Sequence, residues 1–149
     1  MEILLMSLRY PLIRQTSLQL FAFYCCSVSS MTISAQSLQD GIYTAIQAER
    51  GAEEYAARCA SCHSTDLRGN SNSPSLIGLS FMFIWEGKTL GELFHKMSTE
   101  MPTESPGSLS MQSYASILAF ILRSNDFPAG DTDLAASADA LASIPISSN

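Results

Sequence analysis

The chain has 149 residues, which is enough for one domain of ordinary size. Its formal net charge is −6, and 15% of its residues are charged whereas 46% are hydrophobic. This composition is typical of a globular protein and excludes a fully disordered chain. Because an acidic protein repels phosphate backbones, nucleic acid is not an expected partner.

The N-terminal segment differs from the rest of the chain. Two arginines precede a short apolar run over residues 18–28, and small residues follow it up to Ala35. A basic start, a short apolar stretch and a small-residue exit are typical of a secretory signal peptide. The run is too short to cross a bilayer comfortably, and a retained membrane anchor is the alternative. We therefore predict a signal peptide over residues 1–35 and an exported, periplasmic domain over residues 36–149.

Removal of the signal peptide would leave Cys59 and Cys62 as the only cysteines, since Cys25 and Cys26 lie within it. The remaining chain would contain six Lys and Arg against thirteen Asp and Glu, which gives a net charge of −7. A surface of that charge favours partner proteins that present Lys or Arg.

The pattern behind Thr44 predicts the first helix of the domain. Thr44 and Gln47 have the spacing of a capping box. Small and apolar residues then recur on one helical face, at Ala48, Gly51, Ala52, Tyr55 and Ala56. Gly51 costs the helix about 1 kcal/mol relative to alanine. A glycine on a buried face indicates that another backbone or ring comes close.

A C-x-x-C-H motif, formed by Cys59, Cys62 and His63, follows this helix directly. A disulfide would leave His63 unused, and a thioredoxin-like dithiol would need a βαβ pattern that the sequence lacks. A zinc site needs about four ligands, and the only other histidine, His95, is distant. The motif therefore predicts covalent attachment of a c-type haem, with both thiols bonded to the macrocycle and His63 on the iron.

The next segment, residues 64–80, is rich in Ser, Asn, Gly and Pro and is predicted to be a loop. An aromatic run over residues 81–89 follows it. Thr89 can cap a short helix over residues 90–98. The apolar face of that helix leaves His95 in solvent.

Residues 99–110 contain two prolines and a glycine and are predicted to be a second loop. The most apolar helix of the chain is predicted over residues 111–123, with Asn125 as its stop. The tail over residues 125–149 is rich in Ala, Ser and Asp, and we expect it to be loosely packed or partly disordered.

A second axial ligand on the iron would decide the function. The candidates are Met82, Met97, Met101, Met111 and His95. A thioether is a weak ligand that the protein must hold in place, and three of these methionines are more simply explained as core packing. Met101 lies in a loop that Pro102 and Pro106 stiffen, between two helices. We predict that Met101 is the sixth ligand, and an open position is the alternative.

Taken together, these motifs resemble those of a class I monohaem cytochrome c. They are G-x3-Y-x3-C-x2-C-H from Gly51, PSLIG from Pro74, W-x-G-x-T-L from Trp85 and MP-x3-PGSLS-x3-Y-x2-ILAFIL from Met101. The last two stretches, with NDFPAG at residues 125–130, are similar to cytochrome subunits and domains of quinoprotein alcohol dehydrogenases, which use pyrroloquinoline quinone. The resemblance implies an all-α class I cytochrome c fold, with three to five helices and long loops around one covalent haem.

The resemblance also implies the haem-binding residues. Cys59 and Cys62 resemble the two thioether positions, and His63 and Met101 resemble the axial pair.

Three further positions have implied roles. Pro74 resembles the proline whose carbonyl accepts a hydrogen bond from the ligand histidine, which sets the histidine tautomer. Trp85 resembles the aromatic residue near the haem propionates. Gly51 resembles the point where the first helix crosses the last one, against an aromatic residue such as Phe120.

The expected function is that of a periplasmic single-electron carrier and not of an enzyme. It would accept electrons from a dehydrogenase, in this reading a quinoprotein, and pass them to the respiratory chain. Its expected partners are redox proteins, with no stable membrane insertion after signal cleavage. An open sixth position would instead make it a haem enzyme or a protein that binds peroxide or a gas, although no distal histidine or arginine is evident for peroxide cleavage.

Overall fold

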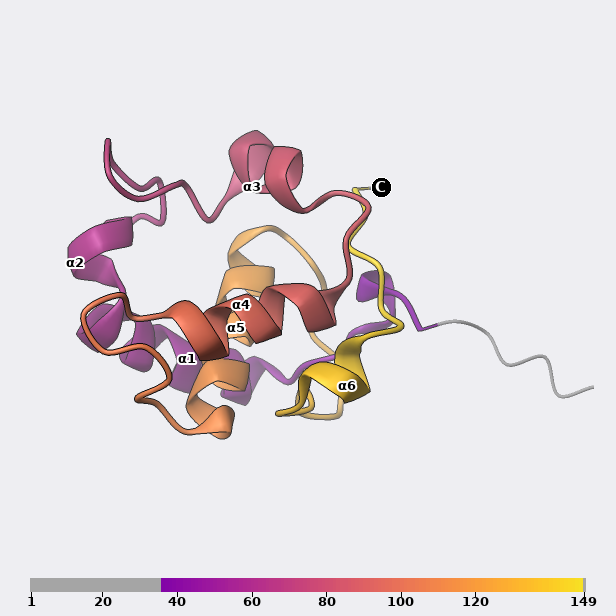
Figure 1. Cartoon of the computed structure of the whole chain (residues 1–149). Helices are drawn as coiled ribbons and strands as arrows, with labels where there is room; N and C mark the ends of the chain where they lie inside the picture. The colour runs from indigo at the N-terminus through magenta and orange to yellow at the C-terminus, as the bar shows by residue number, and fades with distance from the viewer. Residues whose placement is uncertain (1–35, 149) are drawn as a thin grey trace, which may run out of the picture. The chain divides into compact units, whose positions relative to one another are not determined.

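The computed structural model describes residues 36–148, so the predicted signal peptide lies outside the described residues (Figure 1). The elements in chain order are a 3-10 turn η1 (Leu38–Asp40) and the helices α1 (Ala45–Arg58), α2 (Ala60–His63), α3 (Gly78–Trp85), α4 (Leu90–Glu100), α5 (Met111–Ser124) and α6 (Ala138–Leu141). Within the described residues there is no named strand; two isolated bridges join distant segments, Thr44 with Gly130 and Thr89 with Pro145, and a third is local. The all-α class predicted from the sequence is confirmed.

Helices α1 and α5 pack closely together because Gly51 has no side chain. Thr44 caps α1, since its side chain accepts a hydrogen bond from the Gln47 amide, but the predicted capping box is incomplete because the Gln47 side chain bonds to the Leu134 backbone instead. A Cβ atom at Gly51 would lie 1.8 Å from the carbonyl oxygen of Ser116 on α5. Only glycine therefore allows the two backbones to approach this closely, and its helical cost is offset by the packing that it permits.

The crossing of the first and last helices lies at Gly51 as expected, but the atoms nearest to a Cβ there belong to Ser116 and Ile117 rather than to Phe120. Phe120 packs instead against Tyr55, with the ring centroids 5.2 Å apart and the rings tilted by 52°. Tyr55 is one turn beyond Gly51 on α1, and Phe120 is one turn beyond Ser116 on α5. The aromatic pair therefore lies one helical turn away from the backbone contact.

Helix α4 begins with a complete capping box. The Thr89 side chain accepts from the Glu92 amide, and the Glu92 carboxylate accepts from the Thr89 amide. The helix continues two residues beyond the predicted end, and His95 is exposed as predicted. A Cβ atom at Gly91 would lie 2.5 Å from the Ala138 carbonyl oxygen, so α6 packs tightly on the start of α4.

Helix α3 was not predicted. It begins at Gly78, so the last three residues of the loop expected over 64–80 are helical. The two faces of α3 are both apolar: Phe81 and Trp85 are buried, whereas Leu79 and Phe83 are 90% and 91% exposed. With apolar residues all around, the segment has no helical hydrophobic period to recognise.

The C-terminal tail is well packed, and the expectation of a loose or disordered tail is wrong for residues 125–148. Leu134, Leu141, Ile144 and Ile146 are all buried. The Gln47 side chain forms two hydrogen bonds with the Leu134 backbone, and the Ile146 amide donates to the Lys88 carbonyl at 2.8 Å. These anchors come from α1 and from the turn before α4, so composition alone could not reveal them.

Among residues 36–148, no helix has both the length and the apolar character that a membrane crossing requires.

Candidate functional site

One cavity collects every residue that the sequence analysis assigned to the haem. It has a volume of about 350 Å³ and a mostly apolar lining. The predicted residues on its wall are Cys59, Cys62, His63, Pro74, Trp85 and Met101. Helices α3, α4 and α5 supply further apolar wall residues, among them Phe81, Leu93, Ile117 and Ile121. A cavity of this size and character is suited to an apolar cofactor.

The C-x-x-C-H motif reaches the cavity through a change of helix. Helix α1 ends at Arg58, and Cys59 is both its C-cap and the N-cap of α2. The Cys59 carbonyl accepts hydrogen bonds from the amides of Cys62 and His63, at 3.1 and 2.9 Å. This single turn brings Cys59, Cys62 and His63 to the same wall of the cavity.

The His63 ring is oriented by a backbone carbonyl. Its Nδ1 lies 2.9 Å from the Pro74 carbonyl oxygen. Because a carbonyl only accepts hydrogen bonds, Nδ1 must carry the proton in this contact. Nε2 then keeps its lone pair, which is the arrangement that a metal-ligating histidine needs.

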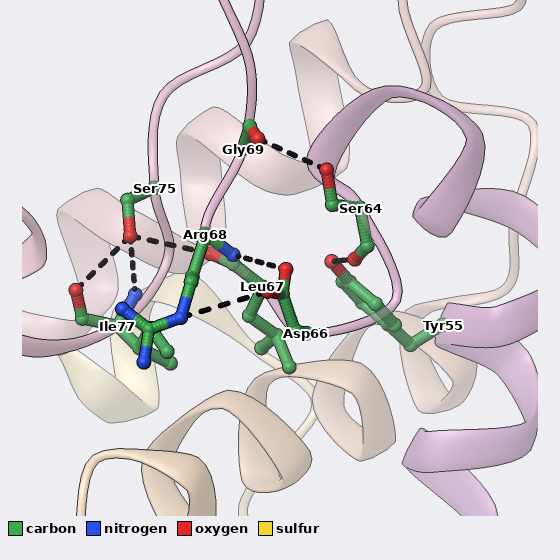
Figure 2. A network of polar contacts seen from close by, with 8 residues as sticks. All are labelled: Tyr55, Ser64, Asp66, Leu67, Arg68, Gly69, Ser75 and Ile77. Atoms are coloured by element: carbon green, nitrogen blue, oxygen red, sulfur yellow. Dashed lines mark hydrogen bonds and ion pairs between the residues drawn. The ribbon is translucent and has the colours of Figure 1, made fainter.

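The loop behind His63 is held by a network of hydrogen bonds, which Figure 2 shows. The Tyr55 hydroxyl donates to the Ser64 carbonyl at 2.6 Å, and the Ser64 hydroxyl donates to the Gly69 carbonyl at 2.9 Å. The Ser75 hydroxyl lies 3.2 Å from the Leu67 carbonyl oxygen. This network connects the segment after His63 to the segment after Pro74. It therefore helps to hold the Pro74 carbonyl in place beside the His63 ring.

On the methionine side, Met101 is the C-cap of α4 and is partly buried. Its carbonyl oxygen accepts hydrogen bonds from the Tyr114 hydroxyl at 2.5 Å and from the Gly107 amide at 3.2 Å. The peptide bond to Pro102 is cis, and Pro102 is buried. Met101 therefore starts a loop whose backbone is fixed at the cavity wall.

The other proposed iron ligands separate into two groups. Met97 lines the cavity together with Met101, whereas Met82 and Met111 are absent from its wall. His95 is exposed and is also absent from the wall. Met97 is therefore the alternative methionine ligand, and an experiment on Met101 has to exclude it.

The surroundings of Cys59 disfavour the thiolate form of its free thiol. Burial raises the pKa of Cys59 to about 11, and the positive charge of Arg58 offsets this only in part. A free thiol of that pKa is protonated at neutral pH and is a weak nucleophile. Residues 36–148 also contain no group of three or more His, Cys, Asp and Glu placed to hold a metal ion. The alternative of a zinc site therefore has too few ligands.

Sequence reasoning missed the two tyrosines at the ends of this site. Tyr55 and Tyr114 are both buried, line the cavity and donate to carbonyls beside His63 and at Met101. Tyr55 was assigned to an apolar helix face, and Tyr114 lies within the apolar helix that was predicted over residues 111–123. Their hydroxyl partners lie outside their own helices, so helical periodicity gave no signal for these bonds.

The residues present fit a covalently bound haem. Two unbonded thiols three residues apart, an imidazole with its Nε2 lone pair available and a thioether all belong to one apolar cavity. These are the groups that a c-type haem requires.

Comparison with known proteins gave one match. The family model described as cytochrome c oxidase, cbb3-type, subunit III matches residues 46–121, which include all but the first residue of α1, all of α2 to α4 and most of α5. No curated protein matches the chain, and no solved structure does.

Proposed function

Because this chain belongs to the cytochrome c family described as cytochrome c oxidase, cbb3-type, subunit III, we propose that it is a single-electron carrier. A cytochrome c domain contains haem c bonded through the cysteines of its C-x-x-C-H motif, which are Cys59 and Cys62 here. The bound haem supplies one-electron redox chemistry. The protein supplies the axial ligands, and we assign these to His63 and Met101.

The observation that carries this proposal is the position of the two ligands. His63 and Met101 line one cavity from different elements, α2 and the end of α4. His63 is in the tautomer that leaves Nε2 free, through its bond to Pro74. Met101 is fixed through its carbonyl oxygen by Tyr114 and Gly107.

Ligation at both axial positions favours electron transfer over catalysis. With both positions filled, no site remains on the iron for peroxide or a gas. Methionine in place of a second histidine raises the reduction potential, which suits a protein that accepts electrons. The environment of Met101 therefore decides between a carrier and a protein with an open iron site.

The proposed partners are redox proteins in the periplasm. The resemblance of MP-x3-PGSLS and NDFPAG to stretches in the cytochrome subunits of quinoprotein alcohol dehydrogenases is the support for a quinoprotein dehydrogenase as the electron donor. The family description names a subunit of a terminal oxidase, which supports an oxidase as the acceptor. The −7 charge from residue 36 onward, with six Lys and Arg against thirteen Asp and Glu, favours basic docking surfaces on these partners.

The proposal is tested by replacing Met101 in the haem-loaded protein. The ferric wild type should show the weak far-red band of sulfur-to-iron charge transfer, and Met101→Ala should abolish it. The variant should also become high-spin or water-ligated, fall in reduction potential and bind carbon monoxide.

Met97→Leu is the matched control because Met97 lines the same cavity. A change of this kind keeps the side-chain volume and should keep the band. Loss of the band in Met97→Leu, with retention in Met101→Ala, would assign the ligand to Met97. A wild type that lacks the band and binds carbon monoxide readily would support the open-site function instead.

A further inference from the structure

Tyr114 lies in the first turn of α5 and has a role beyond core packing. Its side chain is 1% exposed and lines the cavity. Its hydroxyl donates to the Met101 carbonyl at 2.5 Å and lies 3.5 Å from the Leu109 amide, from which it accepts. A single phenol oxygen therefore contacts both ends of the loop over residues 101–109.

That loop has few other attachments to the protein. Its residues from Thr103 to Ser108 are all exposed, and Pro102 is its one buried residue. The Gly107 amide donates to the Met101 carbonyl at 3.2 Å, but that bond lies within the loop itself. Of the hydrogen bonds to the Met101 carbonyl, only the one from Tyr114 comes from outside the loop, and α5 is a packed helix.

We propose that Tyr114 is a positioning residue that keeps the Met101 thioether on the iron. This inference rests on the proposed His63 and Met101 ligation. Tyr114 acts through the Met101 backbone, because its partner is the carbonyl oxygen and not the sulfur. It therefore sets the position from which the thioether extends, and it controls how often the loop opens.

The physical reason is the weakness of the ligand. A neutral thioether competes poorly with stronger ligands, so the iron keeps it only while the loop stays closed. Loss of the Tyr114 hydroxyl removes one hydrogen bond to the closed loop and leaves the Leu109 amide without this partner. An external ligand for iron should then displace Met101 more easily.

The experiment measures binding of imidazole to the ferric, haem-loaded protein. Tyr114→Phe keeps the ring and should retain haem, helix content and the far-red band. Its affinity for imidazole should rise roughly fivefold, as expected from the loss of one ordinary hydrogen bond in the closed state. The temperature at which the far-red band disappears should also fall.

Tyr43→Phe is the matched control. Tyr43 is equally buried, and its hydroxyl donates to the Phe127 carbonyl at 2.6 Å, but it does not line the cavity. This variant should lose stability without a change in imidazole affinity. A similar rise in Tyr43→Phe and Tyr114→Phe would show a general loss of stability and would overturn the proposal.

A second variant guards against misfolding of Tyr114→Phe. Gly107 has a φ of +72° at an exposed turn, so Gly107→Ala strains the closed loop without entering the core. It should raise imidazole affinity in the same direction. If the wild type shows the far-red band and Tyr114→Phe binds imidazole with the same affinity as the wild type, the positioning role of Tyr114 is refuted, whereas the proposed carrier function is not. If the wild type itself lacks the band, the proposed ligation fails.

Discussion

On one side of the cavity, His63 ends a helical turn that Cys59 begins, and its ring is bonded to the Pro74 carbonyl at 2.9 Å. Elsewhere on the wall of the same cavity, on what we call its methionine side, Met101 starts an exposed loop and is attached through its backbone to Tyr114 at 2.5 Å. The histidine side is therefore continuous with the covalent attachment of the haem. The methionine side depends on a hydrogen bond between segments that are 13 residues apart.

This difference separates two tasks within one site. Attachment of the cofactor is encoded in five consecutive residues, from Cys59 to His63, and needs little of the remaining fold. The ligation that we propose for Met101 would need α4, the loop after it and α5 to be packed correctly. We therefore expect changes on the histidine side to affect haem retention, and changes on the methionine side to affect ligation and potential.

The largest effect should come from the two thiols. Cys59→Ser combined with Cys62→Ser removes both covalent bonds to the macrocycle, so no haem should remain on the protein after acid–acetone extraction. Haem stain on a denaturing gel measures this directly. Without its cofactor the small domain also loses the contents of its cavity and should fold poorly.

The two histidines provide the comparison for that experiment. His63→Ala should prevent stable assembly, whereas His95→Ala should leave the spectrum unchanged because His95 is exposed and absent from the cavity wall. Covalent haem on the double serine variant would contradict the attachment site. A change to high spin in His95→Ala would contradict the ligand assignment.

The second largest effect should come from the contact between α1 and α5 at Gly51, because these helices carry the tyrosines of both the histidine side and the methionine side. Tyr55 lies on α1 and Tyr114 on α5, and these helices meet at Gly51. A Cβ at Gly51 would lie 1.8 Å from the Ser116 carbonyl oxygen, so Gly51→Ala must push the backbones apart. We expect a loss of about 3 kcal/mol in the free energy of unfolding, measured by urea titration.

Ala56→Gly on the same helix is the control for Gly51→Ala. Ala56 is exposed, so this change should cost only about 1 kcal/mol through helix propensity. If Gly51→Ala were instead more stable than the wild type, as its higher propensity alone would suggest, the close approach of α1 and α5 would be refuted.

An intermediate effect should appear when the wild type is unfolded gradually. The exposed loop after Met101 has few contacts and should open before the helices unfold. The far-red band should therefore disappear at a lower urea concentration than the helical circular dichroism signal. Coincident transitions for the two signals would show that both sides of the cavity open together.

The sequence predicted which residues line the cavity better than it predicted the bonds between distant segments, for a physical reason. The spacing of Cys59, Cys62 and His63 is local, and the periodic apolar faces of α1, α4 and α5 gave those three helices with small errors at their ends. Contacts between distant segments were not accessible in the same way. The bond from Tyr114 to Met101 and the packing of α6 on Gly91 depend on how the helices meet.

Two further errors have the same origin. Helix α3 has apolar residues on both faces, so the expected hydrophobic period is absent although Phe81 and Trp85 are buried. The tail looked polar because its anchoring residues are few and far apart. It is anchored by hydrogen bonds to distant segments, such as the two between the Leu134 backbone and the side chain of Gln47, which is 87 positions away.

The smallest effect is a pH dependence of stability that comes from two exposed carboxylates. Glu92 lies at the start of α4, and Asp133 contacts α1, so the two carboxylates report on different sides of the cavity. Hydrogen bonds from the Thr89 amide and hydroxyl hold the pKa of Glu92 below its ordinary value of 4.5, at the start of α4. Hydrogen bonds from the Thr44 hydroxyl and the Arg50 guanidinium lower the pKa of Asp133, which contacts the start of α1. A lowered pKa in the folded state means that the carboxylate stabilises the fold above its ordinary pKa. This contribution is lost as the pH falls through the folded value.

Glu92→Gln and Asp133→Asn should therefore each be slightly less stable than the wild type at pH 7, and each difference should shrink as the pH falls below the ordinary pKa. Thermal unfolding between about pH 3 and pH 7 measures this, and ordinary carboxylates titrate within that range. Glu92 caps the helix that ends at Met101, whereas Asp133 contacts the helix that leads to Cys59. Glu92→Gln should accordingly lower the temperature at which the far-red band disappears, and Asp133→Asn should not. The reverse order would mean that closure of the methionine loop depends on α1 rather than on α4, and the separation of the two sides would fail.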